Sequence, residues 1–411
     1  MDARSDRLIV ATKALATLGA CAAAAWVVQA ITASGDYQPG HAVLGDNAAP
    51  AIAALVHGHL AVVPSVQPLM GLVSLLWRAP FAGAGVWLGA GPQVVYQLGV
   101  AACLLPVLGL VLWLGRRAGS LRHLAAVAAG GALMLAGPMT LQALSVGHPE
   151  EVLASVLGTA AVVAASQGRR GGAAALLGLA IGTKPWAALA APCVLLAIPG
   201  GRRAVAILAT AVAAPAVALL PAADPGAFRT AEHVIGGQVT ATLPSLWWTI
   251  TGPPVHRLPF SLSRSDIAAI VVPLALGGIW AYGRRLGDGK PPPVDGLALL
   301  ALLALLRCLV DPAPINYYYV PVVVALATWE AGTRGRLPVL AAAVSASLYL
   351  FMKDIAAVQD NTFVLGALNL VWSCGAVALA IHLLRHVFRA DQGTRGETKR
   401  MGASSPTLGA D

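Results

Sequence analysis

Long apolar blocks, separated by short polar breaks, run from Leu8 almost to Leu384. A helix that crosses the hydrocarbon core of a bilayer needs roughly 20 mostly apolar residues. A membrane barrel would instead show short strands of alternating hydrophobic and polar positions. The pattern therefore predicts an all-α protein, a polytopic bundle of transmembrane helices.

The apolar blocks predict about ten full spans. Their approximate ranges are 8–33, 86–114, 123–144, 152–167, 204–221, 266–282, 294–310, 315–330, 337–351 and 362–384. A long loop follows the first span and continues through Pro80. Within it, Ile52, Leu55, Val56 and Leu60 keep helical spacing, which predicts a helix lying in the membrane interface.

The basic residues between blocks set the expected orientation, because Lys and Arg near helix ends stay on the cytoplasmic side. Arg4 and Arg7 precede the first span, which places the N-terminus inside. The C-terminus then also falls inside, after an even number of crossings. We expect a multi-pass protein of the cell membrane, with one membrane domain over residues 1–388 and a disordered cytoplasmic tail over 389–411.

Residues 171–201 lie between two basic pairs, Arg169-Arg170 and Arg202-Arg203, and are too few for two full spans. One long helix here would place most of the later basic residues outside. The alternative is a short two-armed helical hairpin with Lys184 at its tip. Each arm of about 12 residues would be roughly 18 Å long, which places the tip in the outer half of the membrane.

Composition and charge narrow the function classes. The chain has 411 residues, of which 57% are hydrophobic and 11% charged, which excludes a water-soluble enzyme of this size. The net charge of +9 is divided among short clusters at helix ends, so we expect no nucleic-acid partner. The five cysteines fall inside apolar blocks without metal-ligand spacing, and we expect neither a metal nor a cofactor.

The acidic and histidine residues gather on the predicted extracytoplasmic side. Asp36 and Asp46 in the first loop are candidates for a general base, although Asp46 could instead simply cap the interfacial helix. Glu150 and Glu151, with His148, could orient a polar acceptor at the membrane boundary. Their plainer interpretation is that acidic residues after Pro149 suit the first turn of a helix.

Three cations are candidates for binding an anion. Lys184 is costly in an apolar region unless it pairs, snorkels or meets an anionic ligand. Arg307 precedes Tyr317 and Tyr318, so a guanidinium and phenol groups could clamp a phosphate. The alternative for Arg307 is an ion pair with Asp311 beside an aromatic belt. Arg78 is the weaker third candidate.

Several motifs together resemble the GT-C superfamily of polyprenyl-phosphate-sugar-dependent glycosyltransferases, closest to the family 87 mannosyltransferase group. They are the first loop from Gly45-Asp46 through His57-Gly58, the stretch Gln67-Pro68-Leu69-Met70-Gly71, the helix end Gly178 to Trp186, and the late tyrosine-rich loop. The chain departs from the family in lacking the tyrosine-rich stretch after the first-loop aspartate. His148-Pro149-Glu150-Glu151 also stands where many relatives carry Gly-Gln and Asn.

This resemblance implies a metal-independent, inverting transfer of a sugar, with mannose preferred over arabinofuranose, to a lipid or glycan acceptor of the cell envelope. Asp46, or Asp36 in another register, would be the catalytic base on the extracytoplasmic face. The donor is a polyprenyl-phosphate-linked sugar drawn from membrane lipid. Its phosphate would meet Lys184, Arg307, Tyr317, Tyr318 and Arg78, and the candidates for sugar or acceptor binding are His148, Glu150, Glu151, His57, Gln67 and Trp186.

Two other functions remain open on the sequence. A transporter or flippase for lipid-linked sugars would lack transferase activity, and it should hold its substrate at the membrane midplane between repeats. A non-catalytic subunit that binds the lipid carrier would keep Lys184 and Arg307 but tolerate the loss of Asp46 and Asp36.

Overall fold

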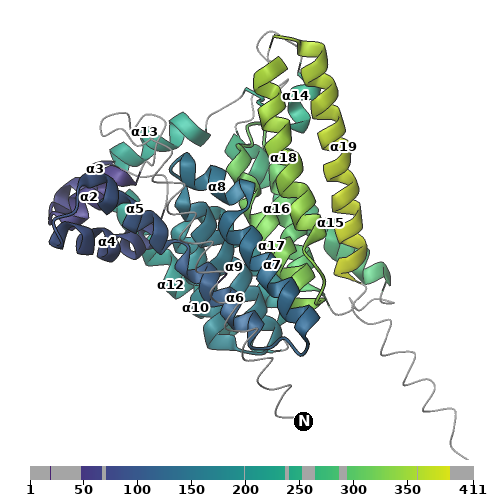
Figure 1. Cartoon of the computed structure of the whole chain (residues 1–411), viewed down its shortest axis with the longest axis horizontal. Helices are drawn as coiled ribbons and strands as arrows, with labels where there is room; N and C mark the ends of the chain where they lie inside the picture. The colour runs from purple at the N-terminus through teal and green to yellow at the C-terminus, as the bar shows by residue number, and fades with distance from the viewer. Residues whose placement is uncertain are drawn as a thin grey trace, which may run out of the picture.

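The computed structural model describes residues 19, 48–66, 71–198, 200–236, 240–251, 264–286, 294–358 and 360–388. Within these ranges the chain is helical and contains no β-strand. The predicted first span, most of the first loop before Ala48, and the tail after Phe388 lie outside the described residues. Figure 1 shows a bundle of helices with a smaller group, α2 to α5, at one side.

Five helices in the described ranges are long and apolar enough to cross a membrane. They are Pro92–Gly115, Leu121–Ser145, Pro149–Ser166, Arg202–Ala223 and Thr362–Val387. Four shorter apolar helices accompany them, namely Pro185–Ala197, Ile270–Tyr282, Gly296–Val310 and Val339–Phe351. The class of all-helical membrane protein follows from these segments, whereas the count of ten full spans remains a prediction.

The helices of the first half are α2 (Ala49–Val56), α3 (Val63–Val66), α4 (Leu72–Trp87), α5 (Pro92–Ala102), α6 (Leu105–Gly115), α7 (Leu121–Ala136), α8 (Pro138–Ser145), α9 (Pro149–Ser166) and α10 (Arg170–Thr183). Those of the second half are α11 (Ala190–Ala197), α12 (Arg202–Ala223), α13 (Pro225–Gly236), α14 (Leu246–Ile250), α15 (Arg264–Leu286), α16 (Gly296–Val310), α17 (Val320–Ala327), α18 (Val339–Val358) and α19 (Thr362–Val387). Short turns, η1 (Leu60–Val62), η2 (Pro185–Leu189), η3 (Asn316–Tyr319) and the π-helical η4 (Thr328–Thr333), connect some of them.

The first-loop prediction was wrong beyond residue 71. Helix α4 runs through Pro80 rather than ending the loop there, and the next span begins at Pro92 rather than near Val86. Proline removes one backbone hydrogen bond, a cost that packing can offset: Leu75 and Ala82 of the same helix are fully buried. The predicted interfacial helix exists as α2, with Ala48 at its N-cap position. Asp46, the predicted capping residue, lies outside the described residues, so its role as a cap stays a prediction.

Helix α9 forms the centre of the bundle. Seventeen of its residues, Pro149 through Ala165, are buried, and it packs against α10, α17, α11, α6 and α16. Small residues also bring α10 close to α12: a Cβ added at Gly178 of α10 would lie 2.6 Å from Cβ of Val212 on α12. The small-residue spacing at Gly178 and Gly182 therefore serves tight helix packing, as the sequence predicts.

The segment between the two basic pairs is a short hairpin. Helix α10 leads to Lys184, and η2 with α11 leads back to Gly200 and Gly201. A Cβ built at Gly201 would lie 3.0 Å from Cδ of Arg170, so the chain has returned to the beginning of α10. Gly201 also has a φ of 73°, a conformation that favours glycine. The two basic pairs therefore lie at the same end of the bundle.

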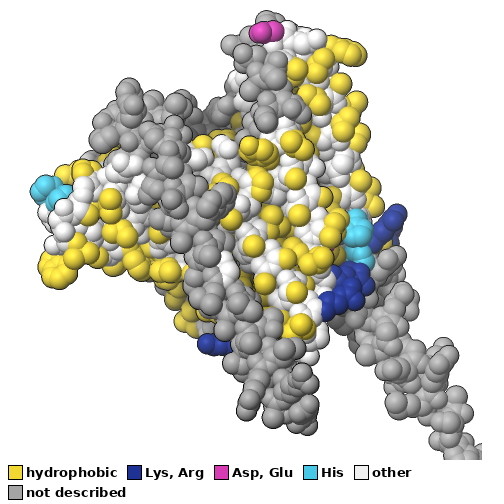
Figure 2. Space-filling model, in the orientation of Figure 1, with side chains coloured by type: hydrophobic (Ala, Val, Ile, Leu, Met, Phe, Trp, Pro, Cys, Tyr) yellow, Lys and Arg dark blue, Asp and Glu magenta, His cyan; other side chains and the backbone are white. Residues whose placement is uncertain are grey.

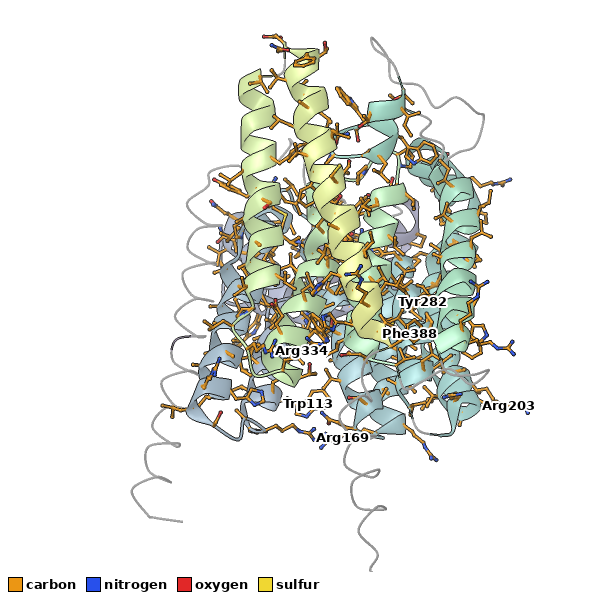
Figure 3. All side chains as sticks on the ribbon, turned by 90° about the vertical axis from the view of Figure 1, so that its right-hand side faces the viewer. Trp113, Arg169, Arg203, Tyr282, Arg334 and Phe388 are labelled. Carbon is orange, nitrogen blue, oxygen red and sulfur yellow. The ribbon has the colours of Figure 1, made fainter. Side chains whose placement is uncertain are left out.

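Basic side chains mark this end of the molecule. Figure 3 shows Arg169, Arg203 and Arg334, which come from three separate loops or helix starts, in the same lower part of the bundle. The Lys and Arg side chains visible in Figure 2 also lie toward this end, while hydrophobic side chains cover the flanks of the helices. We call it the basic end.

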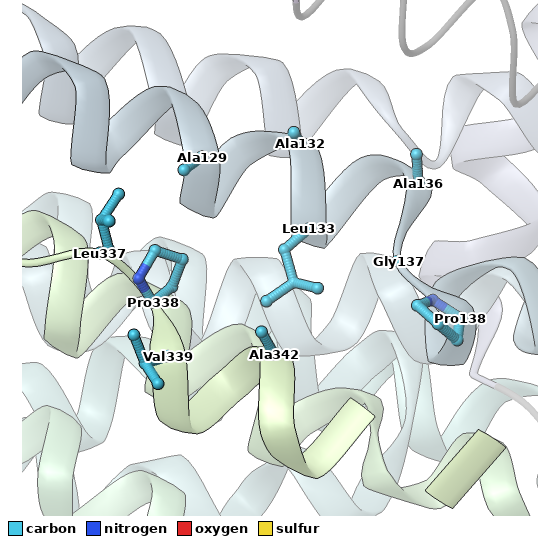
Figure 4. A pocket seen from close by; sticks show the side chains of 10 residues that line it. All are labelled: Ala129, Ala132, Leu133, Ala136, Gly137, Pro138, Leu337, Pro338, Val339 and Ala342. Atoms are coloured by element: carbon cyan, nitrogen blue, oxygen red, sulfur yellow. The ribbon is translucent and has the colours of Figure 1, made fainter. Parts of the chain in front are cut away.

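An open apolar hollow of about 470 Å³ lies between α7, the start of α8 and the start of α18 (Figure 4). Its lining consists of alanine, leucine, valine, proline and glycine residues, among them Leu133 and Ala342. Its lining residues include no ionisable group.

Cysteine labelling tests the hairpin. In a cysteine-free background, Gly171→Cys and Ala204→Cys are expected to react with a membrane-impermeant maleimide from the same side of the membrane. Ser145→Cys, at the far end of α8, should react from the opposite side. All three positions are exposed. Labelling of Gly171→Cys and Ala204→Cys from opposite sides would require one long helix instead of the hairpin.

Candidate functional site

Lys184 is paired with two buried glutamates at the end of the bundle opposite the basic end. Its Nζ lies 3.1 Å from Oε1 of Glu150 and 3.3 Å from Oε1 of Glu151. The Lys184 side chain is 12% exposed, and those of Glu150 and Glu151 are 0% and 1% exposed. A lysine deep among apolar helices therefore has the internal partners that its burial requires.

Local sequence explains why these groups meet. Pro149 occupies the first position of α9, and Glu150 and Glu151 follow in its first turn, where acidic residues suit the helix dipole. Lys184 directly follows the last residue of α10, where Pro185 prevents the helix from continuing. Since α9 runs toward the basic end and α10 runs back, the start of α9 and the end of α10 lie side by side.

His148 extends the ion-pair cluster. Its Nδ1 lies 2.9 Å from Oε1 of Glu150, and its ring stacks on that of Tyr317 at a centroid distance of 4.3 Å. Because the ionised carboxylate only accepts hydrogen bonds, the Nδ1–H of His148 donates to it. In the neutral ring, Nε2 is then left as a hydrogen-bond acceptor.

Arg307 approaches the site from α16 and lies between two aromatic rings. Its guanidinium carbon is 5.1 Å from the centre of the Trp186 ring and 4.6 Å from that of Tyr318. The predicted ion pair with Asp311 is not among the interactions of the described residues. Asp311 instead accepts a hydrogen bond from the backbone N–H of Ala313 at 3.0 Å.

Several buried polar atoms of the site have no hydrogen-bond partner among the described residues. They are Oε2 of Glu150, Oε2 of Glu151, Nη1 of Arg307 and Nε1 of Trp186. A buried polar atom left unsatisfied costs about 1–3 kcal/mol. The site therefore has acceptors suited to hydroxyl groups and a donor suited to an anion.

The structure joins eight of the predicted residues through these contacts. They are His148, Glu150, Glu151, Lys184, Trp186, Arg307, Tyr317 and Tyr318. Tyr317 and Tyr318 contact each other edge to face at 5.0 Å, which links the His148 side of the site to the Arg307 side. We call these eight residues the charged cluster.

Other predicted residues lie elsewhere or outside the described ranges. Arg78 is fully buried in α4, where its guanidinium lies 5.6 Å from the centre of the Tyr96 ring on α5. His57 is exposed at the end of α2, beside His59, and α2 lies apart from α9 in Figure 1. Asp36, Asp46 and Gln67 fall outside the described residues.

Sequence reasoning missed how the candidate residues pair. It treated Lys184 as a phosphate ligand and the two glutamates as a separate acceptor site, whereas they form one ion-pair group. The sequence could have predicted this pairing, because the start of one helix and the end of the next lie side by side when the two helices are consecutive and antiparallel. No group of three or more His, Cys, Asp or Glu residues in the described ranges could hold a metal ion.

Comparison with models of protein families, with curated proteins and with solved structures finds no match to this chain. The class that the fold supports is therefore the all-helical membrane protein. The charged cluster is the candidate for its functional site.

Removing the Lys184 charge should destabilise the protein. Lys184→Met leaves two buried carboxylates without a cation, and breaking a buried pair in this way costs about 3–5 kcal/mol. Thermal unfolding of the purified protein in detergent should show a lower midpoint. The triple variant Lys184→Met, Glu150→Gln, Glu151→Gln should recover much of this loss.

Arg203→Met is a matched control at an exposed position of the basic end, where a substitution usually changes stability by less than about 0.5 kcal/mol. If Lys184→Met unfolds at the same temperature as Arg203→Met, the ion pairs contribute nothing to stability.

Proposed function

We propose that the protein is an integral membrane glycosyltransferase that takes a sugar from a polyprenyl-phosphate donor on the extracytoplasmic face. The acceptor is a hydroxyl of a lipid or glycan of the cell envelope, and mannose is preferred over arabinofuranose as the sugar. One observation carries the proposal: the charged cluster, at the end away from the basic end, contains both an arginine with an unsatisfied Nη1 and buried carboxylates with unsatisfied oxygens. The rings of Tyr318, Tyr317 and His148 connect the two groups. A polyprenyl-phosphate-linked sugar matches both groups: its phosphate accepts hydrogen bonds from the arginine, and the hydroxyl groups of its sugar ring donate to the carboxylates.

Arg307 is the proposed main ligand of the donor phosphate. The rings of Trp186 and Tyr318 hold its guanidinium in place, so little side-chain entropy is lost when the phosphate binds. A guanidinium offers two parallel N–H donors to phosphate oxygens. Lys184 contributes less charge to the phosphate than the sequence predicts, because Glu150 and Glu151 already share it.

Glu150, Glu151 and His148 are proposed to bind sugar or acceptor hydroxyls. The free Oε2 atoms of the two glutamates accept O–H donors, and so does Nε2 of neutral His148. Such sites discriminate strongly against substrates that lack the hydroxyl group, since these would leave a buried acceptor without a hydrogen bond. Trp186 offers an aromatic face to the sugar ring.

The proposed base is Asp46, with Asp36 as the alternative, on the basis of the family resemblance. The base takes the proton of the acceptor hydroxyl, and the acceptor oxygen forms a bond to the anomeric carbon with inversion. The bond from that carbon to the phosphate oxygen breaks, and the lipid phosphate leaves with the electron pair. Arg307 stabilises the charge that develops on the leaving phosphate.

A transporter or flippase for lipid-linked sugars is the second candidate. The buried Lys184 and glutamates favour it, because ionisable groups within a helical bundle often mark a transport pathway. Against it, the charged cluster lies at one end of α9. That helix has 18 residues and is therefore about 27 Å long, so the cluster lies on the outer side of the midplane rather than at it, where a transporter holds its substrate.

Arg307→Gln is expected to weaken donor binding about 10- to 100-fold, because a hydrogen bond to a charged group contributes about 1.5–3 kcal/mol. Binding of radiolabelled polyprenyl-phosphate mannose to the purified protein measures this change. Arg336→Gln, at an exposed position of the basic end, is the matched control and should bind as wild type does. Equal binding by both variants would remove Arg307 from the site.

Asp46→Asn should lower the rate of sugar transfer by about 10²- to 10⁴-fold, the usual contribution of a general base. Donor binding should be unchanged, and Asp36→Asn should transfer normally. Transfer to candidate lipid acceptors by purified protein is the measurement. Normal turnover by both asparagine variants contradicts the assigned base, while donor movement across vesicles without any transfer by wild type supports the flippase.

A further inference from the structure

Two arginines from separate loops meet on one tryptophan at the basic end. The guanidinium carbon of Arg117, in the loop after α6, lies 5.8 Å from the centre of the Trp113 ring. That of Arg169, just before α10, lies 5.5 Å from the same ring. Figure 3 shows Trp113 and Arg169 close together in the lowest part of the bundle.

Because each guanidinium carbon lies within 6 Å of the same ring centre, the two like charges are close enough to repel each other, given a Debye length of about 10 Å in 0.1 M salt. The described residues place no carboxylate in an ion pair with either of them. Both arginines are exposed, so solvent reduces the repulsion without removing it. An anion between the guanidiniums would convert this repulsion into attraction.

The tryptophan points to the same kind of ligand. Nε1 of Trp113 is buried and has no hydrogen-bond acceptor among the described residues. The three side chains therefore supply N–H donors and no acceptor. Phosphodiester oxygens are acceptors only, and guanidinium groups bind them with two parallel hydrogen bonds.

The position of Trp113 and the two arginines in the bundle favours a membrane lipid as the source of this phosphate. Trp113 lies near the end of the apolar helix α6, and tryptophan is enriched at the level of lipid headgroups. Basic loops face the cytoplasmic leaflet, whose anionic lipids attract Lys and Arg.

We propose that Trp113, Arg117 and Arg169 form a binding site for the phosphodiester headgroup of an anionic phospholipid. This site lies at the opposite end of the bundle from the charged cluster. It is therefore independent of the proposed donor site and does not depend on transferase activity.

Native mass spectrometry of the purified full chain, titrated with phosphatidylglycerol, tests the proposal. The double variant Arg117→Gln, Arg169→Gln should bind at least about 10-fold more weakly than wild type, since it loses the hydrogen bonds of two guanidiniums to the phosphodiester, and one hydrogen bond to a charged group is enough for about a tenfold change. Trp113→Phe keeps an aromatic face but lacks the N–H, and it should bind more weakly than wild type but more tightly than the double variant.

Controls separate this site from general attraction. Arg203→Gln removes a charge at the same end, away from Trp113 in Figure 3, and should bind as wild type does. Phosphatidylcholine should bind more weakly than phosphatidylglycerol, and inorganic phosphate should not displace the lipid. Equal affinity in wild type and the double variant overturns the proposal, as does an equal loss in Arg203→Gln or displacement by inorganic phosphate.

Discussion

The ion-pair group of Lys184, Glu150 and Glu151 is the interaction on which the rest of the architecture depends. A lysine between apolar helices is unfavourable unless a carboxylate lies within reach. The contacts of Lys184 at 3.1 and 3.3 Å therefore fix the end of α10 against the start of α9. The group also places His148 and the aromatic side of the site in one region, through the hydrogen bond of Glu150 and the stacking of His148 on Tyr317.

Much of the helical arrangement could be predicted from the sequence because membrane segments have a simple physical signature. The hairpin around Lys184 followed from the spacing of Arg169-Arg170 and Arg202-Arg203, and the contact of Gly201 with Arg170 confirms its return. The extent of α4 could not be predicted, since Pro80 and Arg78 are typical of loops. The packing of α4 against α5, α2, α10 and α12 stabilises both residues within a helix.

The sequence predicted the eight residues of the charged cluster, but it did not predict which of them contact each other. A sequence shows that Lys184 needs a partner, yet it does not show whether that partner is a ligand or another side chain. For Arg307, Asp311 was the nearest acid along the chain, but the end of α16 turns the guanidinium toward Trp186 and Tyr318 instead. His57 shares a loop with the predicted base, and the separate packing of α2 against α4 takes it away from α9.

The shortness of the hairpin has a consequence for the surrounding lipid. Helix α10 has 14 residues and is about 21 Å long, whereas the hydrocarbon core of a bilayer is about 30 Å thick. With Arg170 at one surface, Lys184 lies roughly 10 Å below the other. A lipid headgroup that reaches this depth must sink below its neighbours, so the bilayer should be thinned locally around the hairpin. The thickness of the host membrane would then set how easily a headgroup descends to the level of Lys184.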